Sequence, residues 1–330
     1  SNSGSNDKLI TFLVSHIELL AKNMEDGTTR TFLWCVPRST ACAFTRSLSA
    51  IGGIEVWYEP FFFSFIAELD SKRRLGIDLP TSYDGNEETF QKVADMLKSV
   101  SHFNFKADQL PYAAVKTNLS SSTNKHVFVK DMGFAVNKDV FPFIPLGFKH
   151  TFLIRHPLRV LHSNRKAMFE QLSMIGALEG DAADENKFDL QRDDPYVGPG
   201  LLFKDLYDLW QHCRQNYEDD PVVIDADDLL TKPAEVLSKY CQAVGLPYDE
   251  SLLTFGCSAD LDVFKIWKSP IGVEELRMTV SSFSSKAMES RAFLPANEMP
   301  SRDLLTPDVI RCADEIMEYY DEMFKCRIKV

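Results

Sequence analysis

The sequence predicts an α/β fold with a central, mostly parallel sheet that helices cover on both faces. Short apolar segments typical of buried strands alternate with longer segments whose apolar residues recur at helical spacing. No internal repeat or long low-complexity segment interrupts this alternation. The 330 residues are 45% hydrophobic and 25% charged, which is typical of a globular protein rather than a disordered one. Strands that alternate with helices form parallel sheets with buried faces.

The first part of the chain predicts a strand–turn–helix unit behind an N-terminal helix. Phe44, Leu48 and Ile51 recur at i, i+4 and i+7, which indicates the buried face of a helix that ends at Gly52-Gly53. The expected elements, in order, are a helix at 9–24, a strand at 31–36, a turn at 37–40, this second helix and a strand at 54–58.

The remainder of the chain continues the alternation, and we expect one domain over 9–330. Residues 1–8 are polar and predict a disordered tail or an expression remnant. The acidic, Pro- and Gly-bearing segment 179–200 predicts a mobile surface excursion. The later strands are expected at 127–130, 151–155 and 222–225, and the helices around 87–100, 157–172, 203–217, 232–244 and 307–325.

Charge and hydropathy exclude several classes of partner. The formal net charge of −12 argues against a nucleic-acid partner, although local basic clusters around a small anion remain compatible with it. No apolar run approaches the length of a membrane span. Seven cysteines, an odd number without a C-x-x-C pair, predict reduced core thiols and a cytoplasmic protein. The sequence leaves open an earlier targeting segment and does not indicate an oligomeric state.

The stretch "FLWCVPRSTACAFTRSLSA" at 32–50 has the layout of an anion-binding loop. A strand that enters a helix through a tight turn brings unpaired backbone N–H groups and the positive helix end to one place. Arg38 adds a guanidinium, and Ser39 and Thr40 add hydroxyl donors. The loop has neither glycine nor the Gly-Lys-Ser/Thr of a phosphate-binding P-loop.

A second stretch, "HTFLIRHPLRVLHSNRKAM" at 150–168, repeats this layout. An apolar strand ends at Arg155, Pro157 begins a helix, and Ser163 follows about two helical turns later. An arginine at the strand end and a serine at this distance can converge on one anion. Taken alone, each of the two residues could equally be a solvated surface side chain.

Together the two stretches resemble the sulfotransferases that use 3′-phosphoadenosine 5′-phosphosulfate. The closest resemblance is to a branch with Pro-Arg-Ser-x-Ser-Thr-Ala loops, His-Glu-Pro-Phe after the second strand, and Lys-Asp-Met before an Arg-His-Pro element. The segments that match the last three features, in the same order, are "YEPF" at 58–61, "VKDM" at 129–132 and "IRHP" at 154–157. A later segment, "DADDLLTKPAEVLSKYCQAVGLPY" at 225–248, resembles the family's Glu-Asp-Leu…Pro helix that leads to Gly-Leu-Pro.

The resemblance implies a P-loop nucleotide-kinase-like sulfotransferase fold and two phosphate sites. Arg155 and Ser163 would bind the 3′-phosphate of the donor. The family's third basic element, Arg-Lys-Gly, is absent, and Lys286 or Arg291 would replace it. The loop that would bind the 5′-phosphosulfate consists of Pro37, Arg38, Ser39, Thr40, Ala41 and Cys42; in the family it often reads Pro-Lys/Arg-Ser-Gly-Thr-Thr, so the last three residues depart from that pattern.

The catalytic base is the main departure from the family. Cytosolic members have a histidine in Lys-Thr-His, whereas this chain has Lys130-Asp131-Met132, and methionine cannot accept a proton. Other branches use a glutamate just beyond the second strand, where this chain has Glu59. We expect Pro60 to hold Glu59 extended. Glu59 is thus the expected base, Asp131 its rival, Lys130 a neutraliser of charge at the sulfonate, and Arg38 an aid to departure of the bridging oxygen.

The adenine and acceptor sites are less defined by the sequence. Ala43 stands where cytosolic members place a tryptophan, so Trp267 or Phe283 would stack on the base instead. An aromatic run near Glu59 fits either an apolar acceptor pocket or core packing; it consists of Trp57, Tyr58, Phe61, Phe62 and Phe63.

The resemblance implies transfer of a sulfonate group to a hydroxyl or amine of a small, partly apolar acceptor. The product nucleotide is adenosine 3′,5′-bisphosphate, and no acidic cluster accompanies the loop as a metal site. Two alternatives stay open. The chain could be a nucleotide-binding protein without turnover, because the histidine is missing. It could also be a kinase or a sulfate-ester-dependent dehydratase on the same fold.

Overall fold

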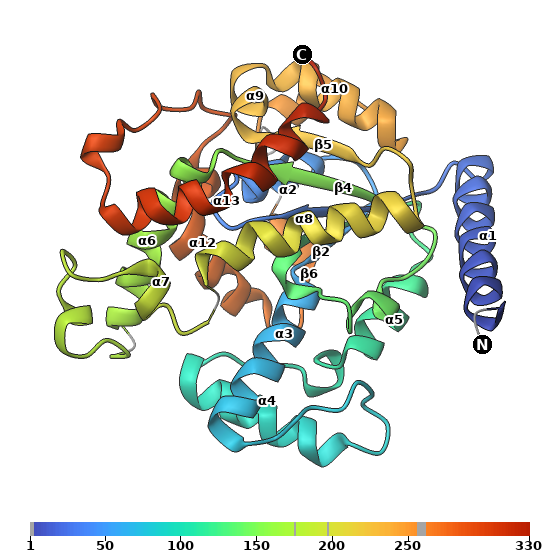
Figure 1. Ribbon diagram of the computed structural model, residues 1–330. Coiled ribbons are helices and arrows are strands. Elements are labelled where there is room, and N and C mark those ends of the chain that lie inside the picture. The colour runs from blue at the N-terminus through green and yellow to red at the C-terminus, as the bar shows by residue number, and fades with distance from the viewer. Residues whose placement is uncertain (1–2, 175, 197, 256–261) are drawn as a thin grey trace.

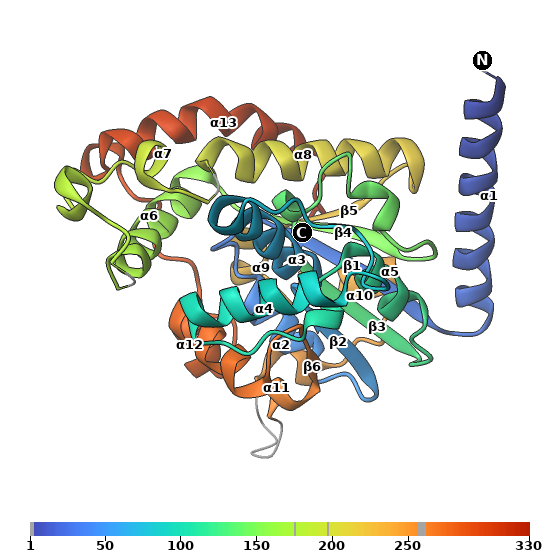
Figure 2. The same ribbon diagram turned by 90° about the horizontal axis from the view of Figure 1, so that it is seen from below.

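The computed structural model describes residues 3–174, 176–196, 198–255 and 262–330, without the side chains of 3–10 and Phe283. Six strands form one sheet in which every neighbouring pair is parallel (Figures 1 and 2). The predicted α/β class is confirmed, and the described sheet is entirely rather than mostly parallel.

The elements agree with most of the predicted ranges. The strands are β1 (Thr29–Cys35), β2 (Ile54–Tyr58), β3 (His126–Met132), β4 (Lys149–Ile154), β5 (Val222–Asp225) and β6 (Trp267–Lys268). Their order across the sheet is β5-β4-β1-β3-β2-β6. The α-helices are α1 (Ser3–Glu25), α2 (Ala41–Leu48), α3 (Pro60–Asp70), α4 (Glu87–Ser101), α5 (Tyr112–Ser120), α6 (Pro157–Met174), α7 (Leu190–Asp193), α8 (Pro199–Asn216), α9 (Ala226–Thr231), α10 (Pro233–Val244), α11 (Val263–Ile266), α12 (Val273–Glu289) and α13 (Pro307–Lys325).

Both faces of the sheet are buried, which explains why its strands are almost continuously apolar. Side chains alternate along β1: Phe32 and Trp34 belong to the core cluster on one face, and Leu33 and Cys35 to the cluster on the other. Helices α6, α8 and α13 contribute to the first cluster, and α2, α10 and α12 to the second. Figure 2 shows α8 and α13 together on one side of the molecule.

The strand order places β1 at the point where the chain reverses its direction of progress across the sheet. The chain moves from β1 to β2, returns to β3 beside β1, and then crosses to β4 on the other side of β1. Such a switch point leaves a crevice at the carboxyl ends of the strands, where ligands bind in open α/β sheets. The ends of β1, β3 and β4 therefore meet where the sequence predicts the site.

The acidic segment 179–200 is anchored in its middle. The buried guanidinium of Arg165 on α6 forms an ion pair with Asp308 on α13, with 3.0 Å between Nε and Oδ2. The same guanidinium donates to the carbonyl of Phe188 at 2.6 Å, and Asp308 accepts from the backbone N–H of Leu190 at 2.9 Å. The mobility of the remainder of the segment stays a prediction.

Helix α1 begins at Ser3, so it includes residues that the sequence analysis assigned to a disordered tail at 1–8.

Helix α1 stands at the side of the molecule (Figures 1 and 2). It contacts the turn before β4 through two hydrogen bonds. Both backbone groups of Gly147 are bound by α1: the Nδ1 of His16 accepts its N–H at 3.1 Å, and Asn23 donates to its carbonyl at 2.9 Å. His16 is buried and lies with its ring 6.5 Å from that of His150. Trp34 donates to the Nδ1 of His150 at 3.0 Å, so both imidazoles act as acceptors and are neutral.

We expect the docking of α1 to weaken in acid. Burial lowers the pKa of His16 to about 4 and that of His150 well below its ordinary value. For a histidine whose folded-state pKa is lowered, the stabilisation is present above the ordinary pKa of about 6.5 and is lost as the pH falls toward the folded-state value. Hydrogen exchange in α1, corrected for intrinsic rates, should therefore lose protection between pH 6.5 and 4.

His16→Asn is the matched variant, because an amide oxygen can accept the N–H of Gly147 without titrating. It should remove the part of the pH dependence that comes from the titration of His16. Equal protection of α1 at pH 7.5 and pH 4.5 in the wild-type protein would contradict this account.

Candidate active site

The loop between β1 and α2 has a strained backbone. Arg38 has a φ of 64° and Thr40 a φ of 74°, which is the left-handed region that non-glycine residues seldom adopt. The buried hydroxyl of Ser39 donates to the carbonyl of Val36 at 2.7 Å, so in this structure it braces the loop. Non-glycine residues with a left-handed backbone conformation concentrate at functional sites, where contacts with the surrounding structure hold them in it. Thr40 occupies the position that is glycine in the Pro-Lys/Arg-Ser-Gly-Thr-Thr pattern.

The loop meets the second predicted stretch directly. The Nε of Arg38 donates to the hydroxyl of Ser163 on α6 at 2.8 Å. The Nη1 of Arg155, which follows β4, donates to the backbone carbonyl of Arg38 at 2.9 Å. The three residues predicted to bind phosphate groups are thus brought together, because β1 and β4 are neighbours and their carboxyl ends coincide.

Because these arginines are partly buried, their positive charges favour an anionic partner. Arg38 and Arg155 are both half-buried, and burial lowers the pKa of each guanidinium below its ordinary value. A guanidinium nevertheless stays charged at neutral pH. Two partly desolvated cations beside the N-termini of α2 and α6 favour an anion with several oxygens.

Sequence reasoning missed two residues of this group, Arg159 and Asp227. Arg159 lies one helical turn after Arg155, and its Nε is 2.9 Å from the Oδ2 of Asp227. The Nε of Arg155 is 3.7 Å from the other carboxylate oxygen. The i, i+4 spacing of the two arginines was available as a signal, but the partner carboxylate lies about 70 residues away and no pattern connects them.

Glu59 and Lys130 form a buried ion pair. Lys130 is 1% exposed and Glu59 5% exposed, and the ammonium group donates to the carboxylate. The ring of Tyr58 lies 4.8 Å from the same ammonium. Burial alone would lower the pKa of Lys130, but the neighbouring Cys35 and Glu59 side chains raise it above its ordinary value. The expected base therefore lies beside the expected charge neutraliser.

The conformation of Glu59 differs from the prediction. Its φ and ψ are 57° and 41°, so it is left-handed and not extended, although Pro60 follows it. The backbone N–H of Glu59 donates to the carbonyl of Lys130 at 2.7 Å. This bond and the ion pair hold Glu59 in a conformation that its neighbour disfavours. The sequence rule failed because it considers the local clash and not these tertiary contacts.

Asp131 caps the helix that follows Glu59. Its two carboxylate oxygens accept the N–H groups of Phe61 at 2.6 Å and Phe62 at 3.0 Å, and also that of Met132 at 2.8 Å. Asp131 is fully buried, and burial raises its pKa to about 8, whereas the three N–H donors act to lower it. Both oxygens are thus engaged with the backbone, which indicates a structural role for the predicted rival base.

The aromatic run packs mainly in the core. Trp57, Tyr58, Phe61 and Phe63 are buried, and Phe62 alone of this run is half-buried. Phe62 and the half-buried Met132 pack against both core clusters, so they lie where the two faces of the sheet meet at its carboxyl edge.

Of the two residues expected to stack on adenine, the structure describes the side chain of Trp267 alone. Trp267 in β6 is 4% exposed, stacks on Tyr58 with 4.9 Å between ring centroids, and donates to the hydroxyl of Ser49 at 2.8 Å. It is a core residue. The side chain of Phe283 lies outside the described part of the chain.

The segment that would supply the third basic element lies against α2. Arg46 on α2 donates to the carbonyls of Ala287, Met288 and Ser290 at 2.7–3.0 Å. At the start of the same helix, the thiol of Cys42 is 3.1 Å from the hydroxyl of Tyr58 and 3.2 Å from that of Ser284. Lys286 and Arg291 are both exposed, and their contact with a nucleotide stays a prediction.

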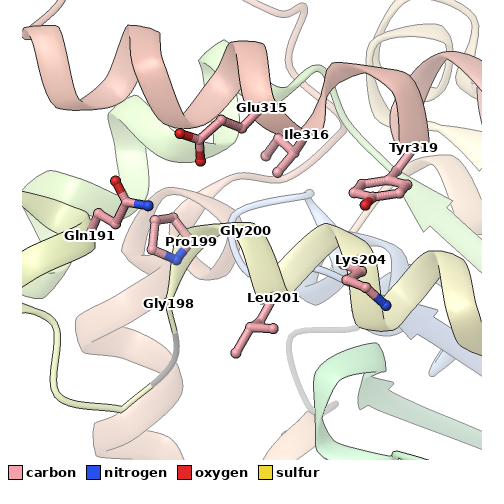
Figure 3. Close-up of a pocket in the computed structure, with 9 residues that line it drawn as sticks. All are labelled: Gln191, Gly198, Pro199, Gly200, Leu201, Lys204, Glu315, Ile316 and Tyr319. Atoms are coloured by element: carbon pink, nitrogen blue, oxygen red, sulfur yellow. The ribbon is translucent and has the colours of Figure 1, made fainter.

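A pocket of about 310 Å³ lies between the start of α8 and α13, away from these residues in sequence (Figure 3). Lys204 and Glu315 supply its charges, and no predicted site residue lines it.

In the part of the chain that the structure describes, no group of three or more His, Cys, Asp or Glu side chains could hold a metal ion. Over the same residues, no helix has the length and hydropathy to cross a membrane.

Comparison with known proteins gives similar structures only. No protein-family profile matches the sequence, and no curated protein matches it. The sulfotransferase domain of the Synechococcus PCC 7002 olefin synthase is 16% identical with a TM-score of 0.38, covering 88% of this chain and 95% of its own. The sulfotransferase domain of the curacin biosynthetic pathway is 14% identical with a TM-score of 0.41, covering 88% and 98%. A sulfotransferase from Alicyclobacillus acidocaldarius is 12% identical with a TM-score of 0.37, covering 78% and 92%.

All three structures are of sulfotransferases, the family that the sequence motifs resemble. With identities of at most 16% and TM-scores below 0.5, the function of this chain has to be argued from its own residues.

We expect Thr40→Gly to stabilise the protein by about 1 kcal/mol, because a left-handed conformation costs an L-residue roughly 1–2 kcal/mol and glycine avoids most of this cost. The Thr40 side chain makes no capping hydrogen bond that would be lost. Chemical denaturation measures the effect. Ala43→Gly, in the right-handed interior of α2, is the control and should destabilise by about 1 kcal/mol or more. Destabilisation by Thr40→Gly would show that the loop is not strained.

Proposed function

We propose that this protein is a sulfotransferase that moves a sulfonate group from 3′-phosphoadenosine 5′-phosphosulfate to a hydroxyl or amine of a small, partly apolar acceptor. The observation that carries the proposal is the contact of Arg38 with both Ser163 and Arg155. Two motifs that resemble the two phosphate-binding elements of one family are 117–125 residues apart in sequence, yet two hydrogen bonds join them: one between the side chains of Arg38 and Ser163, and one from the side chain of Arg155 to the backbone carbonyl of Arg38.

The residues present fit an anionic donor of this kind. Arg38, with backbone N–H groups of the loop 37–42, would hold the 5′-phosphosulfate. Arg155 and Ser163 would hold the 3′-phosphate and thereby select the bisphosphate nucleotide over simpler adenylates. Lys286 or Arg291 would add a third contact. These groups supply positive charge and hydrogen-bond donors, which would stabilise the charge that develops on the bridging oxygen of the departing phosphate without a metal ion.

The reaction needs one proton acceptor and a positioned acceptor oxygen. In an in-line displacement, the acceptor oxygen bonds to sulfur as the bond from sulfur to the bridging phosphate oxygen breaks. The proton of the acceptor hydroxyl passes to a base. Glu59 is our proposed base, since Asp131 is engaged by three backbone donors and Met132 cannot accept a proton. Lys130 would neutralise charge on the transferring group.

A kinase is the second reading on this fold, and the chemistry of the loop argues against it. A kinase P-loop wraps a triphosphate with glycines and holds Mg²⁺ through a Ser or Thr after a lysine. The loop 37–42 has no glycine and no lysine. Transfer that persists in excess EDTA would support the sulfotransferase, and loss of activity restored by Mg²⁺ would support a kinase.

We also propose a cytoplasmic location, consistent with six described cysteines that are all free thiols.

Arg155→Ala should weaken binding of adenosine 3′,5′-bisphosphate by roughly ten- to a hundredfold and weaken AMP binding much less, although the variant also loses the hydrogen bond to the carbonyl of Arg38. The reason is the loss of a charge-assisted hydrogen bond to the 3′-phosphate, worth about 1.5–3 kcal/mol. Calorimetric titration of both nucleotides measures it. An equal loss of affinity for the two ligands would contradict the assignment of Arg155 to the 3′-phosphate.

Glu59→Gln should lower kcat by about 10²–10⁴-fold, because the variant keeps the shape of the side chain but removes a positioned base. Nucleotide affinity should stay nearly unchanged. Asp131→Asn is the comparison, and we expect its main effect to be lower stability through the loss of a buried cap. Turnover abolished by Asp131→Asn in a folded protein, with Glu59→Gln still active, would exchange the two roles.

A further inference from the structure

Three charged groups meet where β4 enters α6, and they do not pair evenly. Asp227, in the first turn of α9, lies between Arg155 and Arg159. Its Oδ2 is 2.9 Å from the Nε of Arg159, whereas its Oδ1 is 3.7 Å from the Nε of Arg155. The carboxylate is therefore closer to the arginine that the sequence motif does not include.

The longer contact leaves part of Arg155 without a hydrogen-bond partner. Among the described residues, the buried Nε of Arg155 and the buried Oδ1 of Asp227 make no hydrogen bond. The Nε of Arg159 is also not hydrogen-bonded, so its contact with Asp227 is purely ionic. The other edge of Arg155 is fixed, because Nη1 donates to the carbonyl of Arg38.

Arg159 is held in place independently of the carboxylate. Its Nη2 donates to the carbonyl of Asn297 at 2.7 Å and its Nη1 to that of Glu298 at 3.3 Å. These carbonyls carry no formal charge, so among the described residues Asp227 is the anion in ion-pair contact with Arg159. The backbone of α9 in turn holds Asp227, since the side chain of Asp225 caps that helix by accepting the N–H of Asp227 at 2.9 Å.

This arrangement matters for an anion at Arg155. A phosphate that approaches Arg155 also approaches Asp227, and the two negative charges repel each other over a few ångströms in a partly buried site. If Asp227 moved the short distance onto Arg155, it would occupy the edge that the phosphate needs. The cation of Arg159 attracts the carboxylate to the far side and offsets its charge.

We propose that Arg159 is a positioning residue for the nucleotide site: it holds Asp227 away from Arg155, so that Arg155 remains available to the 3′-phosphate. The inference rests on the proposed function and adds a residue pair to it. It makes Arg159 and Asp227 determinants of the preference for a 3′-phosphorylated nucleotide, although neither needs to touch the nucleotide.

The test is a double-mutant cycle with two nucleotides as probes. Arg159→Gln should weaken binding of adenosine 3′,5′-bisphosphate by about tenfold in calorimetry. Binding of AMP, which has no 3′-phosphate, should be almost unchanged. Asp227→Asn alone should bind the bisphosphate as well as the wild-type protein or more tightly. The double variant Arg159→Gln/Asp227→Asn should recover to within about threefold of the wild type, because the carboxylate charge that blocks Arg155 is gone.

Arg159→Lys is the matched control, since it keeps the charge but not the guanidinium contacts with Asn297 and Glu298. Near wild-type affinity of this variant supports the charge argument. A double variant as weak as Arg159→Gln would overturn the inference and assign the effect to the lost carbonyl contacts. So would an Asp227→Asn variant that binds the bisphosphate tenfold more weakly.

Failure of the proposed function has a different signature. In that case the wild-type protein would bind the bisphosphate no better than AMP, or Arg155→Ala would change neither ligand. Failure of this inference alone leaves the Arg155→Ala effect intact and removes only the Arg159 effect or its rescue by Asp227→Asn. AMP affinity and the melting temperature of each variant report whether the protein has folded.

Discussion

The contact of Arg38 with the strand β4 and the helix α6 is the interaction on which the rest of the site depends. Arg155 binds the backbone carbonyl of Arg38, and Arg38 binds the hydroxyl of Ser163, so two loops become one surface. The parallel pairing of β1 and β4 makes this contact geometrically natural, because the two strands end side by side. The left-handed conformations of Arg38 and Thr40 are the conformational cost of turning the chain in that place.

The second half of the site comes from two adjacent residues that point to opposite sides of β3. Lys130 binds the side chain of Glu59, and Asp131 binds the backbone N–H groups of Phe61 and Phe62 just beyond it. Together they hold the β2–α3 junction from both sides. A buried ion pair is a weak source of stability, because desolvation offsets most of its attraction. A buried pair of this kind beside the proposed nucleotide-binding loop is more consistent with a chemical role than with a stabilising one.

Much of the fold was predictable from the sequence, and the failures have physical causes. β2 and β5 have the expected bounds because strands buried on both faces are continuous apolar runs. β6 was missed because two residues have no detectable period. The sheet order, with β3 between β1 and β2, depends on non-local pairing that periodicity does not encode. The left-handed Glu59 and the Asp131 cap arise from tertiary contacts, and local preferences predicted neither.

A structure of the protein with adenosine 3′,5′-bisphosphate, obtained in the presence of EDTA, tests the central claim most directly. The claim is that the two loops bind the two phosphates of one nucleotide without a metal ion. We predict the 3′-phosphate within hydrogen-bond distance of Arg155 and Ser163, and the 5′-phosphate at the loop 37–42 beside Arg38. A nucleotide bound elsewhere, bound with its phosphates exchanged, or bound only when Mg²⁺ is supplied would contradict the account.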